Sequence, residues 1–392
     1  MLVSDPPRPN PKLITWARKD AGYSEEQVAK RLQVKLAQVQ GWEGTGKPPT
    51  VRQLMNLAEF LQRPLSLFFQ ESPPALRPLA AEYRRVPGVV PGSESPEFRR
   101  AVRDMLARRQ TTLDLYEELG YDLPEFTLTA TTTEDPKEVG ARLRVRIGIT
   151  TEQQRSWRDA WQAWREWRTA IEGIGVLVFM FPKVPLEQAR GIALIEKRLP
   201  VAAVNTKEFA ESRAYTALHE VVHLMLAAAN QEQPALAESR SAGEFERLER
   251  FAEVAASHAL VAEDAFMQAV GQSAPTGVQA VRELAMRFKV SPLAAATRLR
   301  ESGFWTWPQY NAWRSDWSRQ VADLPKPSGF ATPVSKAIGR GGRTYAQLVF
   351  EALDTNRLTM PEAARALGLR SEHFDKLRVR LVQGSAAEAP DE

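Results

Sequence analysis

The stretch that decides the fold of this chain is ALHEVVHLML, residues 217–226. The chain has 392 residues and four histidines, and two of them, His219 and His223, stand in this stretch with Glu220 beside the first. On a helix, positions i and i+4 share a face, so the two imidazoles can bind one divalent cation. Three ionisable groups in an apolar run are costly to bury unless something binds them. The alternative is an ordinary core helix with satisfied histidines, and the pattern favours the metal site.

Length and composition limit the class of protein and the kinds of site that this chain can form. With 43% hydrophobic and 26% charged residues, the chain is long enough to fold into two or three domains. No apolar run approaches the roughly 18 residues that cross a bilayer, and residues 1–7 lack the basic and apolar parts of a signal peptide. We therefore expect a cytoplasmic protein with no membrane partner. The absence of cysteine leaves only His and carboxylate side chains to hold a metal.

The amino-terminal segment carries the positive charge and clear helix signals. Residues 1–70 contain ten Lys and Arg against six Asp and Glu, an excess equal to the net charge of +4 of the whole chain. Capping residues and glycines predict helices over Leu13–Ala21, Ser24–Leu32, Lys35–Glu43, Val51–Leu61 and Pro64–Phe69. The short connection between the second and third of these helices is typical of a helix-turn-helix.

This segment contains a set of short motifs, which are Ala21-Gly22-Tyr23-Ser24, Val28-Ala29, Trp42-Glu43-Gly44, Lys47-Pro48 and Leu54 to Ala58. With these motifs it resembles the Xre or lambda-repressor type of DNA-binding domain. The resemblance implies that Lys35–Glu43 is the recognition helix, with Val39 and Trp42 turned inward. Double-stranded operator DNA would be the partner, and such domains commonly bind two half-sites as a homodimer. A domain of this type can also serve as a protein-docking module.

Four side chains are candidates for contacts with DNA. Gln38 is placed to hydrogen-bond a base edge, whereas Lys35, Lys47 and Arg52 are better placed to contact phosphates. Apolar residues occupy other positions that usually read bases, which predicts weak base recognition. For each charge taken alone, a solvated surface is the alternative.

The middle of the chain combines a linker, helices and a sheet. Pro73–Pro96 is rich in Pro, Gly and Ser and is typical of a linker, and a helix is expected over Pro96–Gly120. Tryptophans then recur at spacings of four, three and three, which predicts four indoles along one face of a helix, at Trp157, Trp161, Trp164 and Trp167. A core face is favoured over base stacking for this stripe.

Three short β-rich runs precede the HEVVH stretch, at Ile174–Phe181, Ala193–Glu196 and Val201–Val204. The order of helix, small sheet and HExxH helix resembles that of gluzincin and minimal zincin domains. A zinc ion on two histidines commonly takes a carboxylate as its third protein ligand. The downstream candidates are Glu244, Glu246, Glu249 and Glu253, and periodicity does not choose between them.

Several further pieces surround the HEVVH stretch: Leu199-Pro200-Val201, Val204-Asn205, Arg213 to Leu218 running into HEVVH, and Glu249 to Ala256 with Ala265-Phe266. With these pieces, residues about 160–300 resemble the ImmA/IrrE metallopeptidase family. The resemblance implies that Glu249 is the third ligand of Zn²⁺, or of another divalent cation such as Mn²⁺. It also implies that Glu220 is the general base of peptide-bond hydrolysis. Glu253 stands where the family usually has Asn, and its carboxylate is the alternative ligand.

The two resemblances together imply a function. Stand-alone members of the metallopeptidase family cleave helix-turn-helix repressors under stress. We therefore expect a DNA-binding transcriptional regulator with a zinc endopeptidase domain that cleaves itself or a partner repressor in a stress response. The alternative is the repressor and antitoxin of a toxin-antitoxin pair, with a toxin as partner and a structural or inactive metal site.

Toward the carboxyl end, Lys326–Arg343 is typical of a Pro/Gly/basic linker, and the tail from Gln383 is expected to be disordered. Glu362–Leu369 resembles another helix-turn-helix, with a helical packing module as the alternative. The expected fold class is α+β, mainly α: a five-helix lambda-repressor-like domain, a zincin-like domain with a small sheet and an HExxH helix, and a helical carboxyl-terminal region. The expected boundaries are 1–72, 73–160, 161–303 and 304–392.

Overall fold

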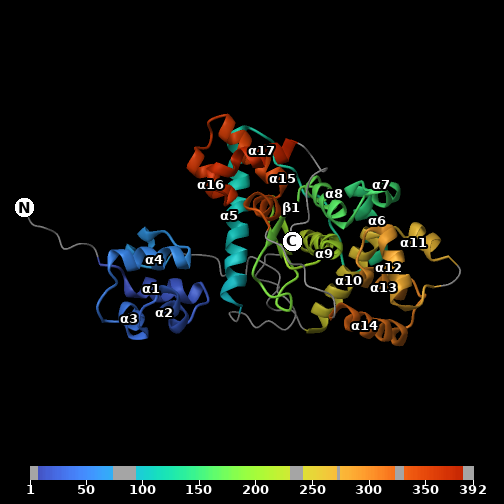
Figure 1. The fold of residues 1–392 in the computed structure, drawn as a ribbon, viewed down its shortest axis with the longest axis horizontal. Coiled ribbons are helices and arrows are strands. Elements are labelled where there is room, and N and C mark those ends of the chain that lie inside the picture. Colours follow the sequence, from blue (N-terminus) through green and yellow to red (C-terminus); the bar gives the residue numbers. More distant parts are fainter. Residues whose placement is uncertain (1–7, 74–93, 230–241, 272–273, 323–330, 383–392) are drawn as a thin grey trace, which may run out of the picture. The chain divides into compact units, whose positions relative to one another are not determined.

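The computed structural model describes residues 8–73, 94–229, 242–271, 274–322 and 331–382 (Figure 1). These residues are mainly helical and contain a three-stranded sheet, which confirms the expected α+β class. They form two compact units: unit 1 ends at Arg103 and unit 2 begins at Asp104. The tail from Gln383 and most of the expected linker Pro73–Pro96 lie outside the described residues.

Unit 1 contains the predicted helices in the predicted order. They are α1 (Pro11–Asp20), α2 (Glu25–Leu32), α3 (Leu36–Glu43), α4 (Val51–Leu61) and the short 3₁₀ helix η1 (Leu65–Phe69). Ser24 caps α2 as its sequence indicates, because its hydroxyl accepts from the backbone N–H of Gln27 and the Gln27 side chain accepts from the N–H of Ser24. Val39 and Trp42 are buried in the core between the helices, as predicted.

The sheet of unit 2 has the strand order β1-β3-β2, with β1 at Leu177–Phe181, β2 at Gly191–Leu194 and β3 at Val201–Asn205. β3 pairs parallel with β1 and antiparallel with β2. All residues of β1 and β3 are buried, because helices cover the sheet, and this explains their unbroken apolar runs. Helices α8 (Ala160–Glu172) and α9 (Ala210–Ala229), the latter carrying the HEVVH stretch, pack against it.

The tryptophan stripe differs in one position from the prediction. The short helix α7 (Thr151–Ser156) ends before Trp157, whose backbone is extended, and Asp159 caps the start of α8. Three indoles therefore lie on α8 and the fourth lies outside it. Trp157, Trp164 and Trp167 are nevertheless buried in one apolar core, which confirms the packing interpretation for these three.

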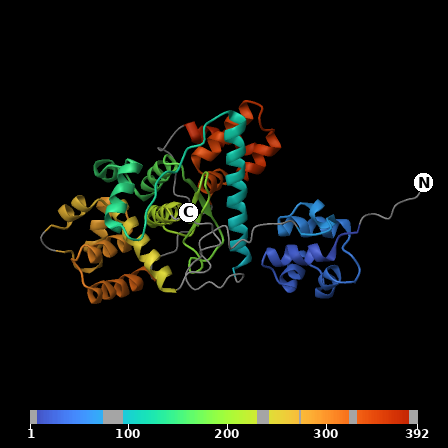
Figure 2. The ribbon, with the colours of Figure 1, turned by 180° about the vertical axis from the view of Figure 1, so that it is seen from behind.

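The remaining helices of unit 2 gather in two groups (Figures 1 and 2). One group extends from α9 through α10 (Ala242–Leu260), which packs on both α9 and α6 (Pro136–Ile147). It continues with α11 (Glu263–Val270), α12 (Gly277–Phe288), α13 (Pro292–Glu301) and α14 (Trp307–Ala322). The other group contains α15 (Pro333–Asp354), α16 (Met360–Leu367), the short η4 (Ser371–His373) and α17 (Phe374–Val382). Leu115 of α5 (Pro96–Leu119) joins the apolar cluster of this second group.

The prediction of a linker over Lys326–Arg343 is wrong for the part that the structure describes, which begins at residue 331. Thr332 caps a helix and Pro333 occupies its first turn, both of which are start signals that the glycine content of the segment obscured. α15 then continues through the glycine-rich part and is interrupted at Gly342. None of the helices in the described part of the chain is long and apolar enough to cross a membrane.

Candidate metal centre and nucleic-acid interface

The first candidate site lies between α9 and α10. Most of α9 is buried, including Leu218 and Val221 at 0% exposure, so the helix is fixed against the sheet and its neighbours. His223 is also buried, and the side chain of His219 is 15% exposed. A helix held this firmly presents the two imidazoles in one direction, toward α10.

Three donor atoms converge there. The Nε2 atoms of His219 and His223 lie 3.0 Å apart. The carboxylate of Glu249 lies 3.3 Å from Nε2 of His219 and 3.7 Å from Nε2 of His223. Donors about 2.0–2.2 Å from a tetrahedral zinc ion lie roughly 3.3–3.6 Å from one another. The spacing and the nitrogen and oxygen donors thus fit a divalent cation of the zinc type.

The structure brings Glu249, and not Glu253, to the histidines among the residues it describes. Glu253 lies one helical turn farther along α10 and is exposed. Its backbone carbonyl oxygen accepts a long hydrogen bond, 3.5 Å, from the Tyr215 hydroxyl. Glu246 is exposed as well.

Glu220 points to a different neighbour, the edge strand β2. It is 7% exposed, and its side chain lies directly against Gly191, the first residue of that strand. A β-carbon at position 191 would lie 2.8 Å from Cγ of Glu220 and closer still to Oε1, and 2.8 Å from Cγ2 of Thr216. Only glycine therefore lets β2 approach α9 this closely.

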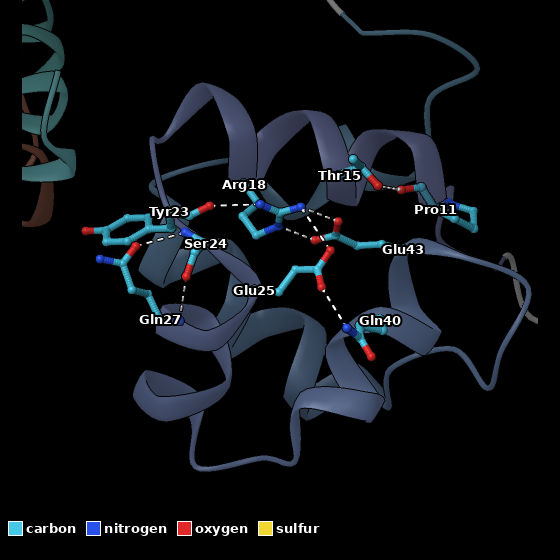
Figure 3. Close-up of polar contacts among 9 residues, drawn as sticks. All are labelled: Pro11, Thr15, Arg18, Tyr23, Ser24, Glu25, Gln27, Gln40 and Glu43. Carbon is cyan, nitrogen blue, oxygen red and sulfur yellow. Dashed lines mark hydrogen bonds and ion pairs between the residues drawn. The ribbon is translucent and has the colours of Figure 1, made fainter. Parts of the chain in front are cut away.

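The second candidate site is the helix-turn-helix of unit 1, and a buried ion pair fixes its third helix (Figure 3). Nε and Nη2 of Arg18 on α1 donate to the two carboxylate oxygens of Glu43 on α3, at 2.6 and 2.7 Å. Nη1 of Arg18 donates to the carbonyl of Tyr23, and Glu25 accepts from Gln40 of α3 at 3.0 Å. The hydrogen bond to Glu43 raises the pKa of Arg18. Both side chains of the pair are at most 10% exposed, so this bidentate pair sets the direction of α3.

The four predicted DNA contacts lie on the surface. Lys35, Gln38, Lys47 and Arg52 are all exposed, as a phosphate or base contact requires. Lys35 is the cap of α3 rather than part of it, and its backbone N–H donates to the side-chain oxygen of Gln38 at 3.1 Å. This hydrogen bond uses the side-chain oxygen of Gln38 and holds that side chain at the start of the helix. The side-chain nitrogen of Gln38 takes no part in it.

Known families match the two regions that carry these sites. Residues 14–68 match the helix-turn-helix family, and residues 174–300 match the family described as the IrrE N-terminal-like domain. The chain joins a helix-turn-helix to an IrrE-like domain. Both resemblances drawn from the sequence are thereby confirmed. No curated protein matches the chain closely enough to add to this assignment.

Two positions that matter for the IrrE-like domain were not singled out as site residues from sequence. Gly191 could have been found from its place at the start of a strand, because glycine in a strand often marks a close approach. Asn205 is fully buried at the end of β3, and its side-chain amide donates to the carbonyls of Val184 and Ala189 at 3.0 and 2.8 Å. It ties down the segment that leads into β2, which places Gly191 against Glu220.

In the helix-turn-helix domain, the sequence reading missed Arg18. Its position beside Ile14 and Ala17 on the buried face of α1 is the available signal, because a charged residue on such a face needs a partner.

Proposed function

We propose that this chain is a DNA-binding transcriptional regulator whose IrrE-like domain is a zinc-dependent endopeptidase. The convergence of His219, His223 and Glu249 on one point between α9 and α10 carries the proposal. Two imidazoles and one carboxylate are a donor set of catalytic zinc sites, in which a fourth position stays open. A zinc ion held there would supply Lewis acidity, which makes water a stronger nucleophile near neutral pH.

Glu220 is the proposed general base. It follows the first histidine on α9, and its burial against Gly191 restricts where its carboxylate can lie. In this role it accepts the proton of the attacking water and then delivers it to the leaving amine of the peptide bond. The acid and base functions thus belong to one side chain, and its position is set by the strand that it touches.

The edge of the sheet suggests how an extended substrate segment would bind. β2 pairs with β3 along one side only in the observed strand order, so its other side is the sheet edge. An extended peptide can add to such an edge through main-chain hydrogen bonds. A peptide on β2 would run beside Gly191 and therefore close to Glu220. We propose that the substrate is an exposed, extended segment of this chain itself or of a partner repressor, cut in a stress response.

The matched pair of variants Glu220→Gln and Glu211→Gln tests the proposal. Glu211 lies in the first turn of the same helix and is exposed. The purified full-length chain is loaded with Zn²⁺, its metal content is measured by native mass spectrometry, and cleavage of itself and of repressors encoded nearby is followed. We expect one zinc ion in every sample and cleavage only by the wild type and Glu211→Gln. Retained cleavage by Glu220→Gln would refute the role of Glu220. A zinc-loaded wild type that binds DNA and cleaves nothing would instead favour the antitoxin alternative.

A further inference from the structure

The last helices of unit 2 repeat the order of helices and turn that is found in unit 1. The segment Thr359–Arg378 aligns without gaps to the segment Ser24–Glu43, so each residue stands 335 positions after its counterpart. We call residues 24–43 the first segment and residues 359–378 the second segment. In each segment an eight-residue helix, α2 or α16, is followed by three residues and then by α3 or by η4 with α17. Two helices joined by a turn of three or four residues have the arrangement of a helix-turn-helix.

The two eight-residue helices begin in the same way. The backbone N–H of Ser24 donates to the side-chain oxygen of Gln27 at 2.8 Å, and the N–H of Thr359 donates to the carboxylate of Glu362, also at 2.8 Å. The angles φ and ψ are −77° and 164° at Ser24, and −81° and 159° at Thr359. A capping box of this kind fixes the residue at which a helix begins.

The turns that follow these helices also agree. Gln33 ends α2 with left-handed angles, φ 55° and ψ 44°, and its counterpart Gly368 ends α16 with φ 59° and ψ 36°. Before the next helical element the angles are −71° and 145° at Lys35, and −68° and 144° at Arg370. The second segment differs only in the tighter first turn after Arg370, which is the 3₁₀ helix η4. The backbone therefore makes the same turn twice.

The apolar positions of the two segments match as well. In the first segment, five side chains lie in the core of unit 1 or pack against it: Val28, Leu32, Val34, Val39 and Trp42. Their counterparts all belong to the apolar cluster that includes residues of α15: Ala363, Leu367, Leu369, Phe374 and Leu377. The same face of the last helix is therefore turned inward in both segments, and the opposite face is exposed.

An ion pair joins the last helix of each segment to the helix that precedes the segment. In unit 1 this pair is formed by Glu43 of α3 and Arg18 of α1. Arg378, the counterpart of Glu43, donates from Nη1 to the carboxylate of Asp354 at the end of α15, at 2.6 Å. This hydrogen bond raises the pKa of Arg378. The signs of the charges are exchanged, but the same position of the last helix is tied down in both segments.

The start of the last helix carries comparable polar groups in the two segments. Arg370 stands at the position of Lys35, and His373 stands at the position of Gln38. Lys35 and Gln38 are the residues before and at the start of α3 that the sequence predicts to contact DNA. The second segment therefore offers a cation and a hydrogen-bonding ring at the two matching positions.

The charge around the second segment favours a polyanion as its partner. Residues 355–382 contain six Lys and Arg against three Asp and Glu. Arg370 and Lys376 are exposed, as a phosphate contact requires. The exposed carboxylates of the same face are Glu372, which lies 3.8 Å from Arg370, and Asp375. Carboxylates do occur in DNA interfaces, where they accept hydrogen bonds from the amino group of cytosine.

From this repetition we propose that the second segment is a further DNA-binding helix-turn-helix, which contacts double-stranded DNA through η4 and the start of α17. It lies outside residues 14–68, which match the helix-turn-helix family. The proposal extends the DNA binding proposed for unit 1 and is independent of the peptidase. Two contacts with one duplex on a single chain increase the overall affinity through the effective concentration of the second contact.

Hydrogen exchange of the full-length chain, with and without DNA, tests each segment separately. The probe is a mixed-sequence duplex of about 40 base pairs, which is roughly four helical turns. We expect DNA to slow exchange both in peptides that cover residues 35–43 and in peptides that cover residues 370–382. Protection of residues 35–43 alone would overturn the second site and leave the DNA binding of unit 1 intact. Protection of residues 370–382 alone would support the second site and refute the first, and no protection of either would refute both.

A matched pair of double variants tests the contact itself. Arg370→Ala with Lys376→Ala removes two exposed charges from the second segment, and Arg146→Ala with Arg282→Ala removes two exposed arginines from α6 and α12. Fluorescence anisotropy with the same duplex at several salt concentrations gives the slope of log K against log salt concentration. The slope should fall by about 2 in the first variant, because each phosphate contact contributes about 1, and should stay unchanged in the control. Equal slopes in the two variants would overturn the proposal, and the second segment would then be a helical packing module.

Discussion

Each unit has a polar cluster that joins two helices. In unit 1 an arginine of α1 pairs with a glutamate of α3, whereas in unit 2 two histidines of α9 meet a glutamate of α10. Arg18 and Glu43 satisfy each other through two short hydrogen bonds, so the pair is complete within the chain. His219, His223 and Glu249 instead bring their possible ligand atoms within 4.8 Å of one another. A salt-bridged pair explains how a helix is held, whereas three convergent donor atoms of the metal-binding type predict a ligand.

Breaking the complete pair should have the largest effect. In Glu43→Ala, Arg18 keeps its charge at a nearly buried position without its main partner, and this should reduce the stability of unit 1 by about 3–5 kcal/mol. The measurement is hydrogen exchange of α1 and α3 peptides in the full-length chain at increasing denaturant concentration.

Glu25→Ala is the matched control for that variant. Glu25 lies 3.5 Å from the same guanidinium group, but its side chain is 31% exposed. Its removal should cost no more than about 1 kcal/mol. Equal losses in the two variants would mean that the pair with Glu43 does not determine the position of α3.

Removing one of the three convergent donors should act on metal binding instead. Glu249→Gln should weaken zinc binding by at least about 100-fold, because even residues that only support a ligand contribute about 10–100-fold. Glu253→Gln should leave zinc affinity unchanged, since that side chain is exposed and the structure groups Glu249 with the histidines. Competition with a fluorescent chelator measures both constants. If Glu253→Gln lost zinc and Glu249→Gln kept it, the extra carboxylate on α10 would be the ligand.

In both regions the sequence predicts the local structure but not the contacts between distant residues. The HEVVH stretch and the capping residues around Ser24 are local patterns, and the helices on which they lie appear where expected. The pair of Arg18 with Glu43, and the approach of Gly191 to Glu220, join residues far apart in the chain. No periodicity within one element reveals such contacts.

The glycine-rich segment before Arg343 was harder to predict from the sequence. Composition indicated a linker up to Arg343, yet α15 begins at Pro333 and turns at Gly342 because Arg168 and Glu172 pack against its backbone. The conformation at Gly342 is thus decided by tertiary packing against two charged side chains of α8.

A smaller effect is expected at Gly191, where strand β2 lies against the side chain of Glu220. Gly191→Ala should lower kcat of the proposed peptidase by roughly 10–100-fold, because the added methyl group displaces the flexible end of Glu220. Zinc affinity should not change, since neither histidine touches this position in the described contacts of Gly191. Steady-state kinetics and metal content are measured together, with Gly243→Ala as the control because a β-carbon there meets nothing within 4 Å. Loss of zinc from Gly191→Ala together with the loss of activity would instead point to general damage of the strand and of the helix beside it.

The smallest effect is expected for an exposed charge that takes no part in the ion pairs of the described residues. Lys47 is exposed and precedes α4, so Lys47→Ala should leave the stability of unit 1 unchanged. If this ammonium group contacts a DNA phosphate, the slope of log K against log salt concentration should fall by about 1, with equal loss on specific and non-specific DNA. Fluorescence anisotropy at several salt concentrations measures the slope. Lys30→Ala, which removes an exposed lysine from α2, is the control for net charge, and the same slope in both variants would exclude Lys47 as a phosphate contact. A surface charge of this kind contributes only when DNA arrives, whereas the charge of Arg18 acts in every folded molecule.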